Sequence, residues 1–327
     1  MAELYPPIEP YDAGMLDVGD GNAVYWETSG DPDGRPALVV HGGPGSGSAP
    51  VSRRLFDPAR YRIIHFDQRN CGRSTPHAAD PATDLRHNTT DHLIADMERL
   101  REHLGVERWL LQGGSWGSTL ILAYAQRHPD RVSAIVIWSV TTTRRSEIDW
   151  LYRGVGRFFP EQWDRFLAGA PGTPRDGDVV GAYARLVEDP DPAVRERAVR
   201  DWCAWEDAVV SAEGGGNPYS DRPSAARTAM VRICARYFAH GAWLPEGQLL
   251  RDAHRLAGIP GVLIHGRLDL GSPLDTAWEL RRGWPDAELI VVDDAGHLAT
   301  VAARRHVVRA LDRFAADEDR STDASSA

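Results

Sequence analysis

Short apolar runs alternate with amphipathic stretches along most of the chain. Runs typical of buried strands occur at residues 23–26, 37–40, 61–66, 109–111, 134–138, 262–265 and 289–292. Strands that alternate with helical segments are characteristic of a mostly parallel sheet, because the crossover between parallel strands is usually a helix that covers the sheet. The pattern therefore predicts an α/β fold with helices on both faces of a central sheet.

An amphipathic helix is predicted over residues 90–104, where leucine and methionine recur at helical spacing. Thr90 or Asp91 is expected to cap the start of this helix, and Gly105 is expected to end it.

The alternation breaks in the middle of the chain and resumes near its end. Residues 141–250 are rich in Trp, Arg and Phe and show mainly helical patterns, whereas strand runs return after residue 260. We interpret residues 141–250 as a helical cap inserted into a core formed by residues 1–140 and 251–316. The polar, small-residue tail at 317–327 is expected to be disordered.

The composition of the chain is that of a soluble globular protein and excludes several other classes of protein. The chain has 327 residues, of which 42% are hydrophobic and 26% charged, as in an ordinary soluble globular protein. Its formal net charge of −10 argues against nucleic acid or an anionic membrane as a partner. Three widely spaced cysteines form neither a disulfide framework nor a zinc motif, which favours the reducing cytoplasm. We see no signal peptide, no membrane-spanning run and no metal-ligand spacing, and we expect no cofactor.

A serine in a glycine-rich turn is the first candidate for chemistry. Ser115 lies in the string Gly-Gly-Ser-Trp-Gly at 113–117, after an apolar run and before a helical pattern. In a strand–turn–helix context, a G-x-S-x-G motif exposes a serine hydroxyl on a strained turn, and a side chain at Gly113 or Gly117 would crowd that turn. The motif is short, and an ordinary glycine-rich loop is an equal alternative when it is taken alone.

Two later residues could complete a catalytic triad with this serine. Asp269 follows one of the late strand runs and His297 follows the last, in the order serine, acid, histidine that accompanies this motif. The carboxyl ends of parallel strands meet at one edge of a sheet, so we expect both side chains near Ser115. The alternatives are a solvated turn aspartate and an exposed loop histidine. His265 lies inside a strand run and is expected to be structural.

A second glycine-rich loop could supply an oxyanion hole. The string His-Gly-Gly-Pro-Gly at 41–45 directly follows a strand run. The N–H groups of Gly43 and of Trp116, the residue after the candidate nucleophile, form the expected donor pair. A plain Gly-Pro turn would explain the glycines but not their placement. His41 is expected to fix this loop by hydrogen bonding.

Taken together, these motifs resemble the proline iminopeptidase family of α/β hydrolases. The likeness rests on the strings at 41–45, 67–74 (Asp-Gln-Arg-Asn-Cys-Gly-Arg-Ser) and 113–118, and it resumes at 266–269 and 295–297, so it covers nearly the whole chain. The resemblance implies an α/β-hydrolase fold with a helical cap and cleavage of N-terminal proline from peptides. It also implies the nucleophile Ser115, its partners Asp269 and His297, and the oxyanion donors Gly43 and Trp116.

The resemblance also identifies where this chain departs from the family in the recognition of a substrate amine. Family members use cap glutamates for this purpose, and one of them corresponds to Glu206 in the pair Trp205-Glu206. The second lies in a motif Arg-Ile-Glu-Asn-His-Tyr-Phe, whereas this chain has Cys234 at the glutamate position. Loss of one carboxylate should weaken binding of a desolvated ammonium group.

Other expected substrate-binding positions differ as well. Thr141 and Leu151 stand where the family has aromatic residues, and Ser272 stands where it has a cysteine after the catalytic acid. Phe238 is the one aromatic residue of the proline pocket that is retained.

Three functions remain open on this basis. The first is a proline iminopeptidase whose substrate amine is held by Glu206, alone or with a nearby acid such as Glu213. The second is a family member that hydrolyses another small amide, ester or lactone, and the third is a binding module without turnover. Epoxide hydrolases and haloalkane dehalogenases carry aspartate at the nucleophile position, so Ser115 argues against both. The expected partner is a small molecule or short peptide, and the oligomeric state is left open.

Overall fold

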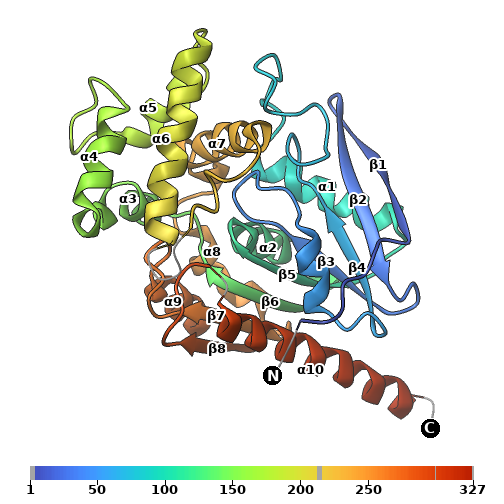
Figure 1. Cartoon of the computed structure of the whole chain (residues 1–327). Coiled ribbons are helices and arrows are strands. Elements are labelled where there is room, and N and C mark those ends of the chain that lie inside the picture. The colour runs from blue at the N-terminus through green and yellow to red at the C-terminus, as the bar shows by residue number, and fades with distance from the viewer. Residues whose placement is uncertain (1–3, 212–215, 299, 326–327) are drawn as a thin grey trace.

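The computed structural model describes residues 4–211, 216–298 and 300–325 (Figure 1). Within these residues, eight strands form one sheet in the order β1-β2-β4-β3-β5-β6-β7-β8. The strands are β1 Asp12–Gly19, β2 Asn22–Gly30, β3 Arg35–Val40, β4 Tyr61–Phe66, β5 Trp109–Ser115, β6 Val132–Val140, β7 Gly261–Gly266 and β8 Ala287–Val292. The β1–β2 and β2–β4 pairs are antiparallel and the remaining pairs are parallel.

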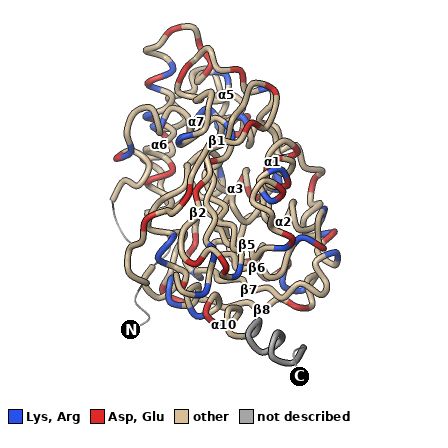
Figure 2. Tube along the Cα trace, turned by 90° about the vertical axis from the view of Figure 1, so that its right-hand side faces the viewer, with Lys and Arg blue, Asp and Glu red and all other residues tan. Residues whose placement is uncertain are grey.

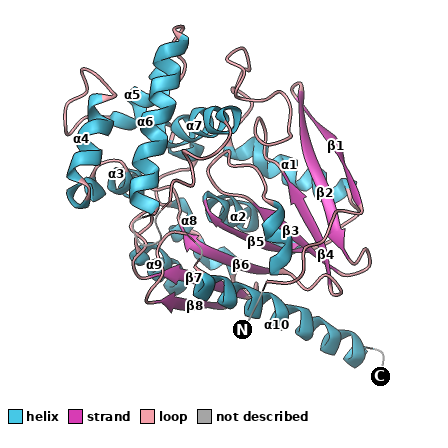
Figure 3. Ribbon diagram, in the orientation of Figure 1, coloured by secondary structure: helices cyan, strands magenta, loops and turns pink. Residues whose placement is uncertain are grey.

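Helices cover both faces of this sheet (Figure 3). They are α1 Thr90–His103, α2 Trp116–Arg127, α3 Arg145–Leu151, α4 Pro160–Ala168, α5 Val179–Leu186, α6 Pro192–Val210, α7 Ser224–Ala239, α8 Gln248–Arg251, α9 Leu274–Gly283 and α10 Val301–Ser325. Short 3₁₀ segments occur at Pro50–Leu55, Pro129–Arg131, Gly154–Phe158, Gly241–Trp243 and Ala253–Leu256.

Alternating side chains of the central strands belong to two separate apolar layers. Leu111 and Ile137 pack in the layer that contains α1, α2 and α9, whereas Leu110 and Val136 pack in the layer that contains α10. Because successive side chains of a strand point to opposite faces, continuous apolar runs such as that of β5 are buried on both sides.

The helices between β6 and β7 form a group beside the carboxyl ends of the strands (Figure 1). Most of them share an apolar cluster of their own, built around the buried aromatic side chains Tyr152, Trp163, Phe166, Trp202 and Trp205. Helix α7 contributes to this cluster and to the core of the sheet, so it connects the two parts.

The seven strand runs expected from the apolar pattern all lie within strands of the structure. The pattern missed β1, which is an edge strand paired only with β2 and has a single buried residue, Val18. The expected N-cap of α1 was wrong by one residue, since Thr89 is the cap and Thr90 Oγ1 instead donates a hydrogen bond of 2.6 Å to Ala242 O. Gly105 ends this helix with a φ of 64°, as expected.

The tail also differs from expectation. Helix α10 continues through Ser325, whereas disorder was expected from residue 317 onward. The chain after Phe314 contains neither glycine nor proline, so nothing in it stops a helix that is already formed. Residues 326–327 lie outside the described part of the chain.

Charged residues of both signs are interspersed along the trace (Figure 2). Among the described residues, no helix is both long and apolar enough to span a bilayer.

Candidate active site

Ser115 lies at the sharp turn between β5 and α2. It is the last residue of the strand and the N-cap of the helix, and its φ of 53° and ψ of −131° are strained for a residue with a side chain. The turn also needs its glycines. A Cβ at Gly113 would lie 2.5 Å from Val40 O, and one at Gly117 would lie 2.4 Å from the same atom, which is too close for either to be accommodated. The crowding that the motif predicts is therefore caused by the end of the neighbouring strand β3.

Asp269 and His297 converge on this serine from the loops after β7 and β8. His297 Nε2 lies 3.1 Å from Ser115 Oγ, and His297 Nδ1 lies 2.9 and 3.1 Å from the two carboxylate oxygens of Asp269. Asp269 is buried, which by itself raises the pKa of its carboxyl, but His297, His265 and the Ser272 N–H together outweigh this effect and lower the pKa overall. An ionised Asp269 can orient the imidazole and stabilise its protonated form.

Ser272 supports the same pair. Its backbone N–H donates to Asp269 Oδ1 at 2.8 Å, and its hydroxyl lies 3.1 Å from Asp269 Oδ2 and 3.3 Å from His297 Nδ1. Sequence comparison assigned Ser272 to the substrate pocket, and it does line the cavity described below. Its hydrogen bonds add a second contact, with the acid and the base themselves.

The loop at 41–45 lies against the serine turn. Gly43 has a φ of 115°, and a Cβ there would lie 2.7 Å from the backbone nitrogens of Gly45 and Ser46. Gly43 and Trp116 line the same cavity as Ser115. Their N–H groups are thus candidates for stabilising a negative oxygen at the serine.

Gln68 connects the two halves of this candidate oxyanion hole. Its side-chain amide donates to His41 O at 2.8 Å, its backbone N–H donates to His41 Nε2 at 3.0 Å, and its Oε1 accepts from Trp116 Nε1 at 3.0 Å. His41 is fully buried, which lowers its pKa and favours the neutral ring that accepts this bond. In the sequence, Gln68 appeared only as a member of the family motif at 67–74. Its position shortly after the end of β4 is the feature that could have indicated a place in the site.

His265 is structural, as expected. Its Nδ1 accepts from Val140 N at 3.0 Å, its Nε2 lies 2.7 Å from Ser272 O, and burial lowers its pKa. The neutral ring therefore connects β7 to β6 and to the loop that carries Asp269 and Ser272.

A cavity opens in front of Ser115, beneath the helices that follow β6. Its walls bring together the expected substrate-binding residues Thr141, Leu151, Glu206, Phe238 and Ser272. Sequence reasoning missed other members of the lining, namely Thr143, Val210, Tyr219 and Gly271.

Glu206 is the one carboxylate among the described residues that line this cavity. Its Oε1 accepts hydrogen bonds from Tyr152 Oη and from Trp202 Nε1, the latter at 2.8 Å. Burial raises the pKa of Glu206, although these two donors oppose the shift. Within the described residues all of its hydrogen bonds end on Oε1, so Oε2 remains available to a ligand.

Cys234 lies beside this carboxylate. Its Sγ is 3.9 Å from Glu206 Oε1 and 3.8 Å from Gly43 O. Burial and the nearby Glu206 raise its pKa well above that of a free thiol, so the side chain is uncharged at neutral pH. Cys234 thus stands between the acid and the candidate oxyanion loop without adding negative charge. Glu213, the other acid considered, lies outside the described residues.

A second, larger hollow meets the first at Gly43, Ser115, Tyr219 and His297. It extends past Val51 and Leu55 toward Val307 on α10, and its lining is largely apolar. The candidate nucleophile therefore lies where a small cavity joins a larger one.

Comparison with known proteins agrees with this architecture. A family model described as the alpha/beta hydrolase fold matches residues 36–301. The chain is 52% identical over 316 residues to a probable proline iminopeptidase of Streptomyces coelicolor, covering 95% of this chain and 98% of the relative. It is 44% identical to a proline iminopeptidase of Xylella fastidiosa strain Temecula1, covering 91% and 95%, and 42% identical to one of Arabidopsis thaliana, covering 90% and 77%.

Solved structures share the fold at lower sequence identity. The crystal structure of a Mycobacterium smegmatis proline iminopeptidase superposes with a TM-score of 0.61 at 18% identity, covering 94% of this chain and all of that chain (100%). A proline iminopeptidase-related protein from Thermus thermophilus gives a TM-score of 0.56 at 24% identity, covering 93% and 97%.

Proposed function

Because the chain belongs to the proline iminopeptidase family of α/β hydrolases, we propose that it is a serine hydrolase that releases an N-terminal residue, proline foremost, from short peptides or amides. The observation that carries the proposal is the line of contacts from Asp269 through His297 to Ser115 at the mouth of a cavity that Glu206 lines. The three unpaired, buried cysteines fit a reducing compartment such as the cytoplasm.

In the proposed mechanism, His297 Nε2 removes the proton of Ser115 as its Oγ attacks the scissile carbonyl. Asp269 holds the imidazole by Nδ1 and stabilises its positive charge. The N–H groups of Gly43 and Trp116 stabilise the oxyanion of the tetrahedral intermediate. His297 then donates its proton to the departing amine, which leaves an acyl-enzyme. Water, activated by the same histidine, hydrolyses the acyl-enzyme and regenerates Ser115.

The two cavities suggest how the substrate lies. We place the N-terminal residue in the smaller cavity, with its ammonium group against Glu206 and its side chain near Thr141, Leu151 and Phe238. The negative charge of Glu206 would pair with the positive ammonium group. An enzyme that recognises a free N-terminus requires such a partner for the buried charge. The rest of the peptide occupies the larger hollow on the other side of Ser115.

A second candidate function rests on Cys234. A neutral thiol beside Glu206 leaves the cavity with a single carboxylate among its described lining residues, which weakens selection for a free amine. The second candidate is therefore hydrolysis of another small amide, ester or lactone.

One substrate panel separates these functions. Turnover of prolyl, alanyl and N-acetylprolyl arylamides is compared with that of simple aryl esters. Strong preference for the free prolyl amide supports the aminopeptidase, and indifference to the amine or turnover of esters alone supports the second candidate. Covalent labelling by a fluorophosphonate, lost in Ser115→Ala, distinguishes either enzyme from a binding module. Failure of the wild-type protein to label would contradict the whole proposal.

A further inference from the structure

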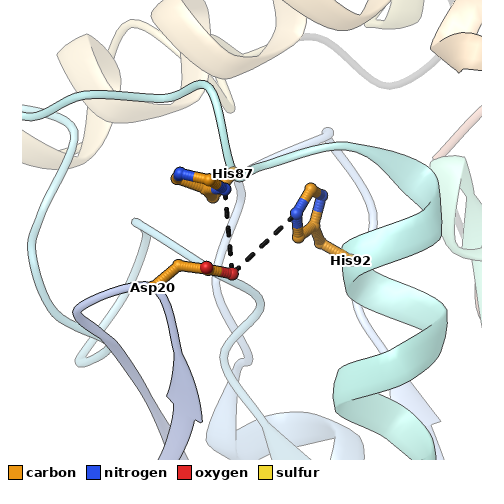
Figure 4. A group of neighbouring side chains, drawn as sticks. All are labelled: Asp20, His87 and His92. Carbon is orange, nitrogen blue, oxygen red and sulfur yellow. Dashed lines mark ion pairs between the residues drawn. The ribbon is translucent and has the colours of Figure 1, made fainter.

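Three side chains with metal-binding atoms gather outside the cavities described above (Figure 4). Asp20 lies in the turn between β1 and β2, with a φ of 57°. His87 lies in the loop before α1, and His92 lies in the first turn of that helix. One ligand atom from each residue lies within 4.8 Å of the other two.

We propose that Asp20, His87 and His92 form a binding site for a divalent transition-metal ion, with Zn²⁺ as the first candidate. Asp20 Oδ2 lies 3.7 Å from His87 Nδ1 and 3.9 Å from His92 Nε2. Because a Zn–N or Zn–O bond is about 2.0–2.2 Å long, two atoms bound to one ion lie at most about 4.2 Å apart. Both separations fall within that limit, and the ligand atoms of the two histidines lie within 4.8 Å of each other. The tetrahedral arrangement that Zn²⁺ prefers needs the ligands somewhat closer, and rotations of these part-exposed side chains would bring them together.

The imidazole rings are arranged as ligands require. The hydrogen bond of 2.8 Å between His92 Nδ1 and Thr89 Oγ1 occupies one ring nitrogen and leaves Nε2, on the side of Asp20, to bind metal. A ligating histidine typically has its second nitrogen held in this way. The rings of His87 and His92 lie edge to face, with centroids 5.5 Å apart, so neither blocks the nitrogen of the other.

Arg69 is a basic side chain in contact with Asp20, and its charge is already matched by Asp96. Its Nε and Nη2 donate to the two oxygens of Asp96 at 2.6 and 2.8 Å, and its Nη1 donates to His87 O at 2.8 Å. Its contact with Asp20 Oδ2 is longer, at 3.5 Å. A bound ion would thus replace only a weak interaction of Asp20.

The ligand set indicates which metal binds. Two imidazoles and one carboxylate suit Zn²⁺ and its transition-metal neighbours, whereas Mg²⁺ and Ca²⁺ prefer sites made of oxygen. Three protein ligands leave a further position for water or an external group. The ion would join the β1–β2 turn to the start of α1, so its binding should stabilise the folded state.

The test is a titration of the full chain, stripped with chelator, with ZnCl₂ followed by calorimetry and by thermal unfolding. We expect saturable binding of a single ion at this site and a rise in Tm. Both should be lost in His87→Ala/His92→Ala and retained in His254→Ala, a control that removes an exposed histidine elsewhere. MgCl₂ at the same concentrations should produce neither effect.

Two results would overturn the proposal: absence of saturable Zn²⁺ binding to the wild-type chain, or equal binding by the double variant and by wild type. If the double variant does not fold, as judged by circular dichroism, His87→Ala alone carries the test, because this side chain is 41% exposed and its loss leaves the core intact. Unchanged Zn²⁺ affinity in that folded variant would equally refute the site.

Discussion

Replacement of Glu206 by glutamine tests the proposed recognition of a substrate amine. The substitution keeps the shape of the side chain and an oxygen that can accept from Tyr152 and Trp202, but it removes the one negative charge among the described residues that line the cavity. Glu206 is 6% exposed, so an ammonium bound there is largely shielded from water.

The size of the effect follows from this burial. Removal of one partner of a buried ion pair costs about 3–5 kcal/mol. Since about 1.4 kcal/mol corresponds to a factor of ten, we expect kcat/KM for a prolyl arylamide to fall by between about 10²-fold and about 4 × 10³-fold. Turnover of an aryl ester that carries no amine should change little. Burial raises the pKa of Glu206 and so disfavours its charge, and the variant should therefore be no less stable than wild type.

The assay measures kcat/KM for both substrates in wild type, Glu206→Gln and Glu196→Gln. Glu196 lies on the same helix α6 but its side chain is 73% exposed, which makes it a matched control for loss of a carboxylate. If kcat/KM fell equally for the amide and the ester in Glu206→Gln, the residue would be acting on folding or on the triad and not on amine binding. An unchanged kcat/KM for the prolyl substrate would refute its role in amine binding.

Four further predictions concern the same site. Ser115→Ala should abolish turnover and fluorophosphonate labelling while leaving the circular dichroism spectrum unchanged; wild-type activity would refute the assignment. Gln68→Ala should lower kcat by about 10- to 100-fold for amides and esters alike, because it frees Trp116 to shift; a change confined to KM would place Gln68 in substrate binding instead. Cys234→Glu should raise the preference for free-amine over N-acetylated substrates, because it adds a carboxylate beside Glu206. An unchanged preference would mean that residue 234 does not contact the substrate amine. Burial raises the pKa of Glu206, so protonation on acidification removes its charge at a pH above the usual glutamate range; kcat/KM for amine substrates should therefore fall at a higher pH than for esters, and identical pH profiles would contradict this.

The apolar pattern was sufficient to predict the central strands because they are buried on both faces. Such strands read as continuous apolar runs whatever surrounds them. Strand β1 was missed because it is an edge strand with one buried residue, so it lacks the continuous apolar run of the central strands. The N-cap of α1 was also mispredicted. Thr90 donates a hydrogen bond to Ala242, a residue far along the chain, and a contact of this kind cannot be read from the local sequence.

The candidate triad could be predicted because each member lies at, or a few residues after, the carboxyl end of a strand. Parallel strands bring their carboxyl ends to one edge, so Ser115, Asp269 and His297 were expected to meet before any distance was known. The supporting contacts of Gln68 and Ser272 were not predictable in this way. They depend on side-chain directions at loops, and loop residues carry no periodic signal.

The sequence by itself determined the alternation of strands and helices, the serine turn, the order of the candidate triad residues and the family. These features are local, since they depend on apolar spacing, on glycine at crowded turns and on position relative to a strand. Only the tertiary structure decided that Cys234 lies beside Glu206, that Ser115 joins two cavities, and that Asp20, His87 and His92 converge. Those contacts join residues distant in the chain, and their geometry depends on how the helices after β6 pack on the core and how one hairpin meets α1.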